Sequence, residues 1–417
     1  MRVLILLSIL LNGVLSAAPF AYVANVGGTT VSVIDTATLA VTTIALAAGS
    51  GPGTVAITPN GSFAYVGDFT SGNVNVINTT TSVITATIAV GTNPGNTSNA
   101  IPITPNGSFA YAAIFGPGNV IVIKTANNTI AATVTVGTNP GGTAISPNGS
   151  FAYVCNFGSG NISVITTATN IVTATIPFGG NPTVPGLTPN GSFLYVSNNA
   201  ANNVIVYQTS NNAITATITV GTGPGGVAIT PNGSFAYVSN FNGATGTSVS
   251  VITTATNIVT ATITVGTGPF GIAITPNGSF AYVANSGSTT VSIINTSTKI
   301  VTATITVGTN PQDIAMTPSL PTSPLVTVAQ QRDVSASQTD LYAIVGWTTA
   351  GSTHTYTNFF VYRDAAYTNL AGTTNNNTLR FEDHNLNASQ TYTYFVVGYT
   401  ELLGLIPFGN ASITIAP

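Results

Sequence analysis

Charged side chains are scarce in this 417-residue chain, in which Lys, Arg, Asp and Glu make up 4% of the residues. An ordinary soluble protein carries roughly 25%. The scarcity is greatest between Ala18 and Ser319, a region with three Asp, two Lys and no Glu, His or Arg. Groups that transfer protons in acid–base catalysis are therefore nearly missing from most of the chain. The formal charge of −3 also provides no basic surface, so we expect no nucleic-acid partner.

Cysteine and long apolar runs are also scarce. The single cysteine, Cys155, excludes a disulfide framework and a CxxC metal site. Beyond the N-terminus no run approaches the roughly 20 apolar residues that a spanning helix needs, so we expect no transmembrane segment. At the N-terminus, Arg2 precedes the apolar run 3–11 and the small residues 16–18, a pattern typical of a secretory signal peptide. The sequence therefore predicts a signal peptide over residues 1–18 and a secreted, extracellular protein at the cell surface.

What the sequence does contain is a repeat close to T-P-N-G-S-F-A-Y-V-x-N. Its tyrosines are spaced 42 to 46 residues apart, at Tyr22, Tyr65, Tyr111, Tyr153, Tyr195, Tyr237 and Tyr282. A period of about 40–45 residues is what four short strands and their turns require, which is one propeller blade. Alternating apolar residues predict four strands in each repeat. The fold class predicted is all-β, a seven-bladed β-propeller of four-stranded blades over residues 19–319.

The ends of the repeat region predict how the ring closes. The chain enters the ring at a second strand, residues 20–23, with no first strand before it. A surplus first strand appears at the far end, over residues 313–316. We therefore expect the strand 313–316 to complete the N-terminal blade, which removes the exposed edges that an open array would have.

The period stops after the ring. Residues 320–324 form a Pro/Ser/Thr linker, and residues 325–417 show six or seven short strands, which predict a β-sandwich. Trp347 lies on an early strand, and Leu386 precedes Tyr392 by six residues before an alternating apolar run. This part resembles a fibronectin type III domain, in which Trp347 would be the core tryptophan and Tyr392 the tyrosine corner.

The ring carries its own family resemblance. The segments Y-V-A-N, Y-V-S-N and Y-V-C-N, followed by S-G-N-I-S-V-I-T-T-A-T-N-I-V-T-A-T-I, resemble the YVTN family of β-propeller repeats over residues 20 to about 318. The resemblance implies a secreted, periplasmic or surface-layer protein, and many such proteins have no known reaction. This chain departs from the family pattern because its turns have almost no Lys, Asp or Glu.

One loop position recurs as a candidate binding site. The loops between second and third strands carry a phenylalanine in four blades, at Phe69, Phe115, Phe157 and Phe241. Together with the G-T-x-P-x-G interblade loops they would form an uncharged rim around the channel, suited to a carbohydrate or protein partner. The alternative is that each phenylalanine packs inward between blades.

Carboxylates supply the remaining candidates. Asp68 and Asp313 are possible binding residues, and a Ca²⁺ held by these two with Asp35 is conceivable, although scattered Asp are more often turn residues. In the sandwich, His354, Glu382, Asp383 and His384 could in principle ligate zinc, but a solvated loop explains them better. We therefore expect no catalytic residue, no metal and no cofactor.

The function predicted from these observations is that of a non-enzymatic, secreted binding and assembly protein of the surface-layer or adhesion type, with self-assembly possible. The alternative is an extracellular propeller enzyme of the lactonase or hydrolase type. The alternative needs groups around the channel that can promote hydrolysis, and the predicted ring offers few carboxylates for that role.

Overall fold

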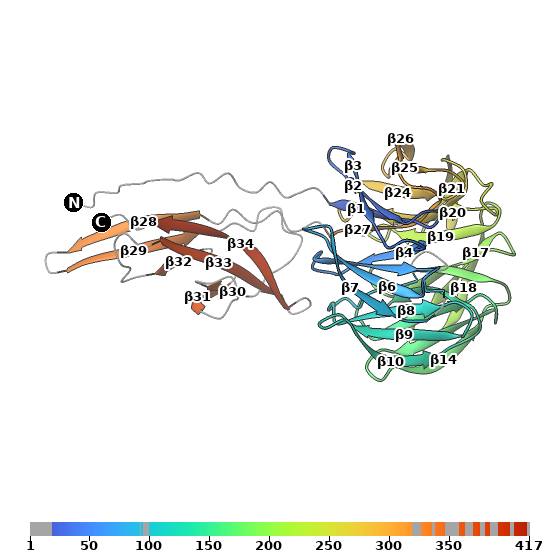
Figure 1. Cartoon of the computed structure of the whole chain (residues 1–417), viewed down its shortest axis with the longest axis horizontal. Helices are drawn as coiled ribbons and strands as arrows, with labels where there is room; N and C mark the ends of the chain where they lie inside the picture. The colour runs from blue at the N-terminus through green and yellow to red at the C-terminus, as the bar shows by residue number, and fades with distance from the viewer. Residues whose placement is uncertain are drawn as a thin grey trace. The chain divides into compact units, whose positions relative to one another are not determined.

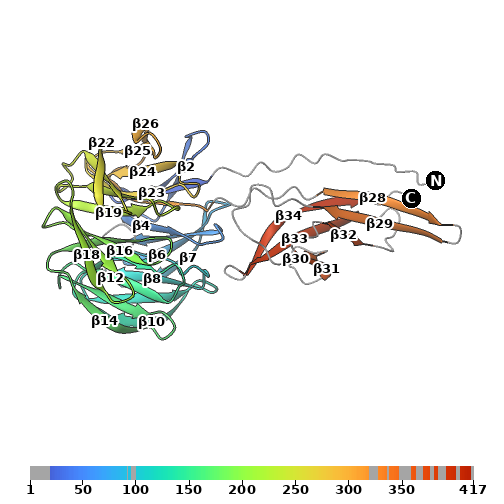
Figure 2. The same ribbon diagram turned by 180° about the vertical axis from the view of Figure 1, so that it is seen from behind.

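The computed structural model describes residues 19–91, 93–94 and 100–318, together with seven strands between residues 327 and 414. By its internal contacts the chain divides into two compact units, of which one spans Ala18–Pro318. This unit is a ring of antiparallel sheets (Figures 1 and 2), and the described residues of the chain form strands and turns without a helix long enough to span a membrane.

Each sheet of the ring is one blade, with its strands ordered from the channel outward. Blade 1 contains β27 (Pro311–Met316), β1 (Phe20–Asn25), β2 (Thr30–Asp35) and β3 (Val41–Ala45). Blade 2 contains β4 (Pro52–Ile57), β5 (Phe63–Asp68), β6 (Asn73–Asn78) and β7 (Val83–Ala89). Blade 4 contains β11 (Pro140–Ile145), β12 (Phe151–Asn156), β13 (Asn161–Thr166) and β14 (Ile171–Pro177).

The later blades follow the same order. Blade 5 contains β15 (Pro182–Leu187), β16 (Phe193–Asn198), β17 (Asn203–Gln208) and β18 (Ala213–Thr219). Blade 6 contains β19 (Pro224–Ile229), β20 (Phe235–Asn240), β21 (Ser248–Thr253) and β22 (Ile258–Thr264). Blade 7 contains β23 (Pro269–Ile274), β24 (Phe280–Asn285), β25 (Thr290–Asn295) and β26 (Ile300–Thr306). The predicted all-β, seven-bladed propeller is therefore confirmed.

Blade 3 differs from the predicted pattern. Its described strands are β8 (Phe109–Ile114), β9 (Asn119–Lys124) and β10 (Thr129–Thr135). On the channel side, two isolated bridges join Pro94 to Ile114 and Ile103 to Ala110. The sequence between these bridges is longer than the six-residue first strands of the other blades, so it cannot pair along its whole length with the six residues of β8. A bridge at each end therefore stands where the other blades have a continuous first strand.

The ring closes as predicted, through a strand from the far end of the ring sequence. Strand β27 pairs antiparallel with β1, with Tyr22 opposite Ala315 and Val23 opposite Ile314. A further bond runs from the backbone N–H of Phe20 to the Thr317 hydroxyl, at 2.7 Å. The first blade thus gains an inner strand, and the edge of β1 is paired rather than exposed.

The repeated tyrosine connects adjacent blades through a hydroxyl hydrogen bond in five of the seven repeats. The side chains of Tyr65 and Tyr111 are buried, and their hydroxyls reach Asn128 and Asn170 in the following blades at 2.6 and 2.7 Å. A buried phenol needs such a partner, because an unpaired polar group in the core costs free energy. The Y of the repeat is therefore an interblade residue, surrounded by Val, Ile and Ala from two adjacent sheets.

The T-P-N-G-S segment forms the turn between first and second strands. In blade 2 the Asn60 side-chain oxygen accepts hydrogen bonds from the Thr58 hydroxyl at 2.8 Å and the Ser62 backbone N–H at 3.1 Å. Gly61 has a φ of 74°, which favours glycine. These turns lie at the end of the blade opposite to the loops that follow the second strands.

The C-terminal part forms two antiparallel sheets among its described strands. One contains β28 (Thr327–Ser335), β29 (Gln338–Gly346) and β32 (Arg380–Asp383). The other contains β31 (Leu370–Asn375), β30 (Asn358–Tyr362), β33 (Thr391–Thr400) and β34 (Gly404–Thr414). Two small antiparallel sheets are what a β-sandwich requires, but the packing of one sheet on the other, the fibronectin type III resemblance and the 320–324 linker stay predictions. Trp347 lies outside the described residues.

Candidate functional site

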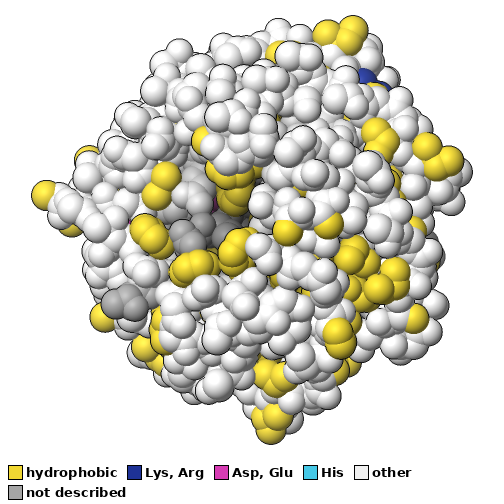
Figure 3. Space-filling model, turned by 90° about the vertical axis from the view of Figure 1, so that its right-hand side faces the viewer, with side chains coloured by type: hydrophobic (Ala, Val, Ile, Leu, Met, Phe, Trp, Pro, Cys, Tyr) yellow, Lys and Arg dark blue, Asp and Glu magenta, His cyan; other side chains and the backbone are white. Residues whose placement is uncertain are grey.

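A pocket opens on the side of the ring where the second strands end. It has a volume of about 330 Å³ and is lined by Val26, Phe241, Ala244, Phe270, Ser286, Asn310 and Gln312. These residues come from blades 6, 7 and 1. The space-filling view shows a hollow at the centre of this side, bordered by hydrophobic side chains, with Lys or Arg visible only near the outer edge (Figure 3).

Backbone hydrogen bonds place one residue of each blade at the rim of this hollow. The residue after the second strand donates its backbone N–H to the preceding interblade loop: Val26 to the Asn310 carbonyl at 3.0 Å, and Phe241 to the Gly223 carbonyl at 3.0 Å. The seven rim residues are Val26, Phe69, Phe115, Phe157, Asn199, Phe241 and Ser286. The scaffold therefore fixes this position, and the side chain varies from blade to blade.

The glycine of the G-T-x-P loop has a packing reason. A Cβ atom at Gly308 would lie 2.5 Å from the Asn25 side chain, and one at Gly266 would lie 2.4 Å from that of Asn285. These asparagines end the second strands, and their amides donate to the third strand, for example from Asn25 to the Ser32 hydroxyl at 3.0 Å. The Y-V-x-N and G-T-x-P motifs thus fit each other and hold the rim residue between them.

The first departure from the repeat is in blade 6. The loop between β20 and β21 covers seven residues, 241–247, whereas the corresponding loop of blade 7 covers four, 286–289. Ala244 in this longer loop has a φ of 69°, a conformation that costs free energy for a residue other than glycine. The loop reaches blade 7, where the Gly268 N–H donates to the Gly246 carbonyl at 2.7 Å. It forms one wall of the pocket.

The second departure is an aromatic residue in a glycine position. The residue after the proline that opens the first strand is Gly53, Gly141 or Gly225 in blades 2, 4 and 6, but Phe270 in blade 7. The Phe270 and Phe241 rings meet edge to face, with centroids 4.9 Å apart and planes at 68°. Gly225 leaves room for this contact, because a Cβ atom there would lie 2.9 Å from the Phe270 ring.

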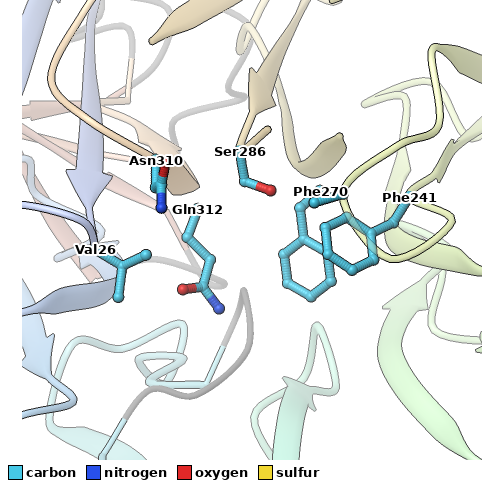
Figure 4. A pocket seen from close by; sticks show the side chains of 7 residues that line it. Val26, Phe241, Phe270, Ser286, Asn310 and Gln312 are labelled. Atoms are coloured by element: carbon cyan, nitrogen blue, oxygen red, sulfur yellow. The ribbon is translucent and has the colours of Figure 1, made fainter. Parts of the chain in front are cut away.

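The third departure is Gln312, at the same position of blade 1. Its side chain lies across the pocket from the two phenylalanine rings, with Asn310 and Val26 on its own side (Figure 4). Ser286 completes the lining and donates its hydroxyl to the Gly268 carbonyl at 3.0 Å, which leaves the hydroxyl oxygen to accept from a ligand. The pocket therefore has an aromatic wall facing a neutral polar wall.

The four phenylalanines predicted as a rim occupy equivalent positions and are all half-buried. Phe241 lines the pocket, whereas Phe69, Phe115 and Phe157 are not among its lining residues. The structure thus brings one of the four to the pocket. A binding role for the other three, outside this pocket, stays a prediction.

The two predicted carboxylates connect blades 1 and 2 at the inner side of the ring. Asp68 accepts from the backbone N–H of Gly51 at 2.7 Å. Burial favours its neutral form, but hydrogen bonds from Ser50, Gly51 and Ser71 outweigh this effect and lower the pKa of its carboxyl.

The carboxyl of Asp313 accepts from the Thr54 hydroxyl at 2.8 Å and the Val55 N–H at 3.0 Å. Each of the two aspartates is 1% exposed, and neither lines the pocket. A structural role therefore accounts for both, and their binding role stays a prediction.

The remaining candidates lie elsewhere. Asp35 accepts from the Ala37 N–H at 2.8 Å in the turn that joins β2 to β3. Cys155 is fully buried between blades 4 and 5, and burial raises the pKa of its thiol. Among the described residues no three potential ligands gather in a way that could hold a metal. His354 and His384 lie outside these residues.

Sequence reasoning missed most of the pocket. Phe241 was identified, and one of the G-T-x-P-x-G loops predicted at the rim contains Phe270, but Val26, Ala244, Ser286, Asn310 and Gln312 were not singled out. The signal that could have found several of them was the departure from the repeat. The blade 6 loop is longer, and Phe270 and Gln312 interrupt a column of small residues. Which of these positions share a pocket depends on the order of blades around the ring.

Solved structures share this fold. A chain of Kuenenia stuttgartiensis hydrazine synthase matches with a TM-score of 0.59 and 21% identity, covering 68% of this chain and 93% of that chain. A protein of unknown function from Desulfotomaculum acetoxidans matches with a TM-score of 0.63 and 18% identity, covering 72% and 99%. A putative 6-phosphogluconolactonase from Bacteroides uniformis matches with a TM-score of 0.60 and 17% identity, covering 72% and 99%. At these identities the likeness shows the fold. No functionally curated protein matches the chain.

A family match is more informative. The model of the family described as "Lactonase, 7-bladed beta-propeller" matches residues 20–173, 186–258 and 210–307, well over half of the chain. This match contradicts the prediction that the protein is not an enzyme and favours the hydrolase alternative. The prediction relied on the missing acids and bases, but opening a lactone also depends on polarising its carbonyl, which neutral amides can do. The chain belongs to the seven-bladed β-propeller lactonase family.

Proposed function

We propose that this protein is a hydrolase that opens lactones in the pocket over blades 6, 7 and 1. The observation that carries the proposal is the convergence of three departures from the repeat on one pocket. The longer loop 241–247, Phe270 and Gln312 come from different blades and line the same cavity. Other departures lie outside this pocket, in the first strand of blade 3 and at Asp68, but these three meet at one cavity.

The size and lining of the pocket support a small substrate. A cavity of about 330 Å³ lies at the lower end of the range of roughly 300–1,000 Å³ that is usual for ligand pockets. Apolar walls with a few placed polar groups are typical of such sites. Phe241 and Phe270 would hold the body of the substrate, while Asn310 and Gln312 can donate hydrogen bonds to its carbonyl oxygen.

The chemistry is addition of water to the acyl carbon. Water forms the new C–O bond, the ring C–O bond breaks, and the ring oxygen takes up a proton, so that the product is the open hydroxy acid. Negative charge develops on the carbonyl oxygen in the transition state, where amide donors stabilise it. None of the seven lining side chains titrates near neutral pH, so water and hydroxide would carry the protons.

The test is release of acid from a panel of sugar and aliphatic lactones, followed at constant pH. Loss of one donor to a developing oxyanion typically costs roughly 100-fold or more in kcat. Gln312→Gly, which installs the residue of other blades, should therefore lower kcat by about 100-fold. Without a titrating base in the pocket, kcat/KM should rise steadily with pH and show no plateau near neutrality.

The matched control is Phe157→Ser, which changes an equivalent rim position in blade 4. This variant should keep the wild-type rate, because Phe157 does not line the pocket. Absence of hydrolysis across the panel, or equal rates for the wild type and Gln312→Gly, would refute the proposal. Circular dichroism of each variant separates loss of activity from loss of fold.

A further inference from the structure

We propose that the pocket selects an uncharged, hydroxylated ring, such as a sugar lactone without a phosphate group. This inference rests on the proposed function for its chemistry, but it makes a separate claim about which ligands bind. It follows from where the positive charges of the ring lie and from the two unlike walls of the pocket.

The lysines of the ring lie away from the pocket. Lys124 ends β9, opposite Phe109, at the end of the blade where the T-P-N-G-S turns lie. Lys299 lies in the turn between β25 and β26, with its ammonium 4.7 Å from the centre of the Phe235 ring. Third strands begin at the pocket side and end at the opposite side, so both lysines belong to the opposite side.

A phosphate group would therefore lose its hydration at this pocket without gaining a cation. Proteins bind phosphates through Arg, Lys or clustered backbone N–H groups. The lining instead offers two amides, one hydroxyl and four apolar side chains. The Asp313 carboxyl, next to Gln312 in β27, adds a nearby acidic group. Electrostatics thus disfavours an anionic ligand.

The two walls match the two characters of a sugar ring. The edge-to-face pair of Phe241 and Phe270 offers an apolar surface, against which the C–H face of a ring can pack. Across the pocket, Asn310 and Gln312 lie where they can meet the rim of the same ring (Figure 4). Amides both donate and accept, so each can pair with a hydroxyl in either direction.

The fit also explains why the aromatic pair occurs only here among equivalent positions. Phe270 needs the space left by Gly225. A phenylalanine at the position of Phe241 also occurs in other blades, but among the described residues it contacts a second phenylalanine ring here. A wall that merely filled the channel could use any apolar residue. Two rings held at 68° to each other form a corner, into which a flat or chair-shaped ring fits better than a flexible chain.

The experiment is calorimetric binding to the full chain. The probes are the lactam of gluconic acid, which is neutral and is not hydrolysed, and the same lactam phosphorylated at its primary hydroxyl. The neutral lactam should bind at least about tenfold more tightly, a difference of roughly 1.4 kcal/mol. Equal or tighter binding of the phosphorylated form would overturn the inference, as would no binding of the neutral form.

Two variants test the two walls. Phe270→Gly installs the residue of blades 2, 4 and 6, and Asn310→Ala removes an amide on the opposite side. Each should weaken binding of the neutral lactam by about tenfold or more, while Phe157→Ser leaves it unchanged. If the Phe270→Gly variant fails to fold, the binding measured with Asn310→Ala still tests the inference. Hydrolysis of aliphatic lactones without lactam binding would refute this inference and leave the proposed function standing.

Discussion

At the scale of single residues, the buried tyrosines link the stability of the ring to pH. Their rings lie between adjacent blades, and desolvation by burial raises the pKa of seven of them to about 12, namely Tyr22, Tyr65, Tyr111, Tyr195, Tyr207, Tyr237 and Tyr282. In an unfolded chain the same groups titrate near roughly 10. Each tyrosine therefore favours folding only while its hydroxyl keeps its proton.

The sign of this linkage predicts alkaline unfolding. The folded state holds these protons more tightly than the unfolded state, so the tyrosine contribution is fully present below about pH 10 and is lost as the pH rises toward 12. Because seven groups act together, we expect one steep transition within this interval. Tyrosinate absorbance and circular dichroism should change at the same pH. A gradual ionisation with the fold intact would contradict the prediction.

Asp68 allows a second test at this scale. It occupies the position where blades 1 and 7 have Asn25 and Asn285, and it binds the Gly51 and Ser71 backbone N–H groups. Asp68→Ala leaves these donors without their partner and should destabilise the ring by about 1–3 kcal/mol, measured by urea unfolding. The Asp68→Asn variant keeps an acceptor oxygen and should therefore lose less stability than Asp68→Ala. Equal stability of Asp68→Ala and the wild type would show that water replaces the carboxylate at no cost.

At the scale of elements, the sequence predicted strands well because each blade repeats one pattern seven times. The predicted strand 313–316 corresponds to β27, which begins two residues earlier at Pro311. Blade 3 was predicted less well, since a longer segment replaced the regular first strand. The pocket was largely missed, because a repeat predicts what is common to the blades and the site is made from what differs.

Ring closure by β27 gives the prediction for this scale. A chain of residues 19–318 keeps β27, whereas one of residues 19–310 lacks it and leaves the edge of β1 unpaired. The shorter chain should melt at a lower temperature and aggregate through this edge. Light scattering and thermal denaturation of the matched pair provide the measurement. Two monomeric proteins with the same melting temperature would show that β27 is dispensable.

At the scale of the whole molecule, the ring contains few groups that titrate in acid. It contains three aspartates and no Glu or His between Ala18 and Ser319. Asp68 has a lowered pKa, so its contribution is present above the unfolded pKa of roughly 3.9 and is lost as the pH falls through the folded value. Lowering the pH can therefore remove the contributions of only very few groups to the stability of the folded ring.

We accordingly expect the stability of the 19–318 ring to be nearly constant from about pH 9 down to about pH 3. An ordinary protein loses many paired carboxylates over the lower part of this range. Urea unfolding midpoints measured across this pH range test the prediction. In the Asp68→Asn variant the midpoint should depend even less on pH at the acidic end. A loss of most of the stability by about pH 3 would contradict the prediction.

The pairing of β27 with β1 also has a meaning for synthesis. The ring sequence begins with the second strand of a blade and ends with a first strand. The first blade therefore contains both the earliest and the latest parts of the ring sequence. A ribosome must deliver the ring sequence through residue 316 before the N-terminal blade has its inner strand. Until then the nascent ring keeps an unpaired edge. The ring can therefore close only after its whole sequence has been translated. A product truncated before β27 keeps the edge of β1 unpaired.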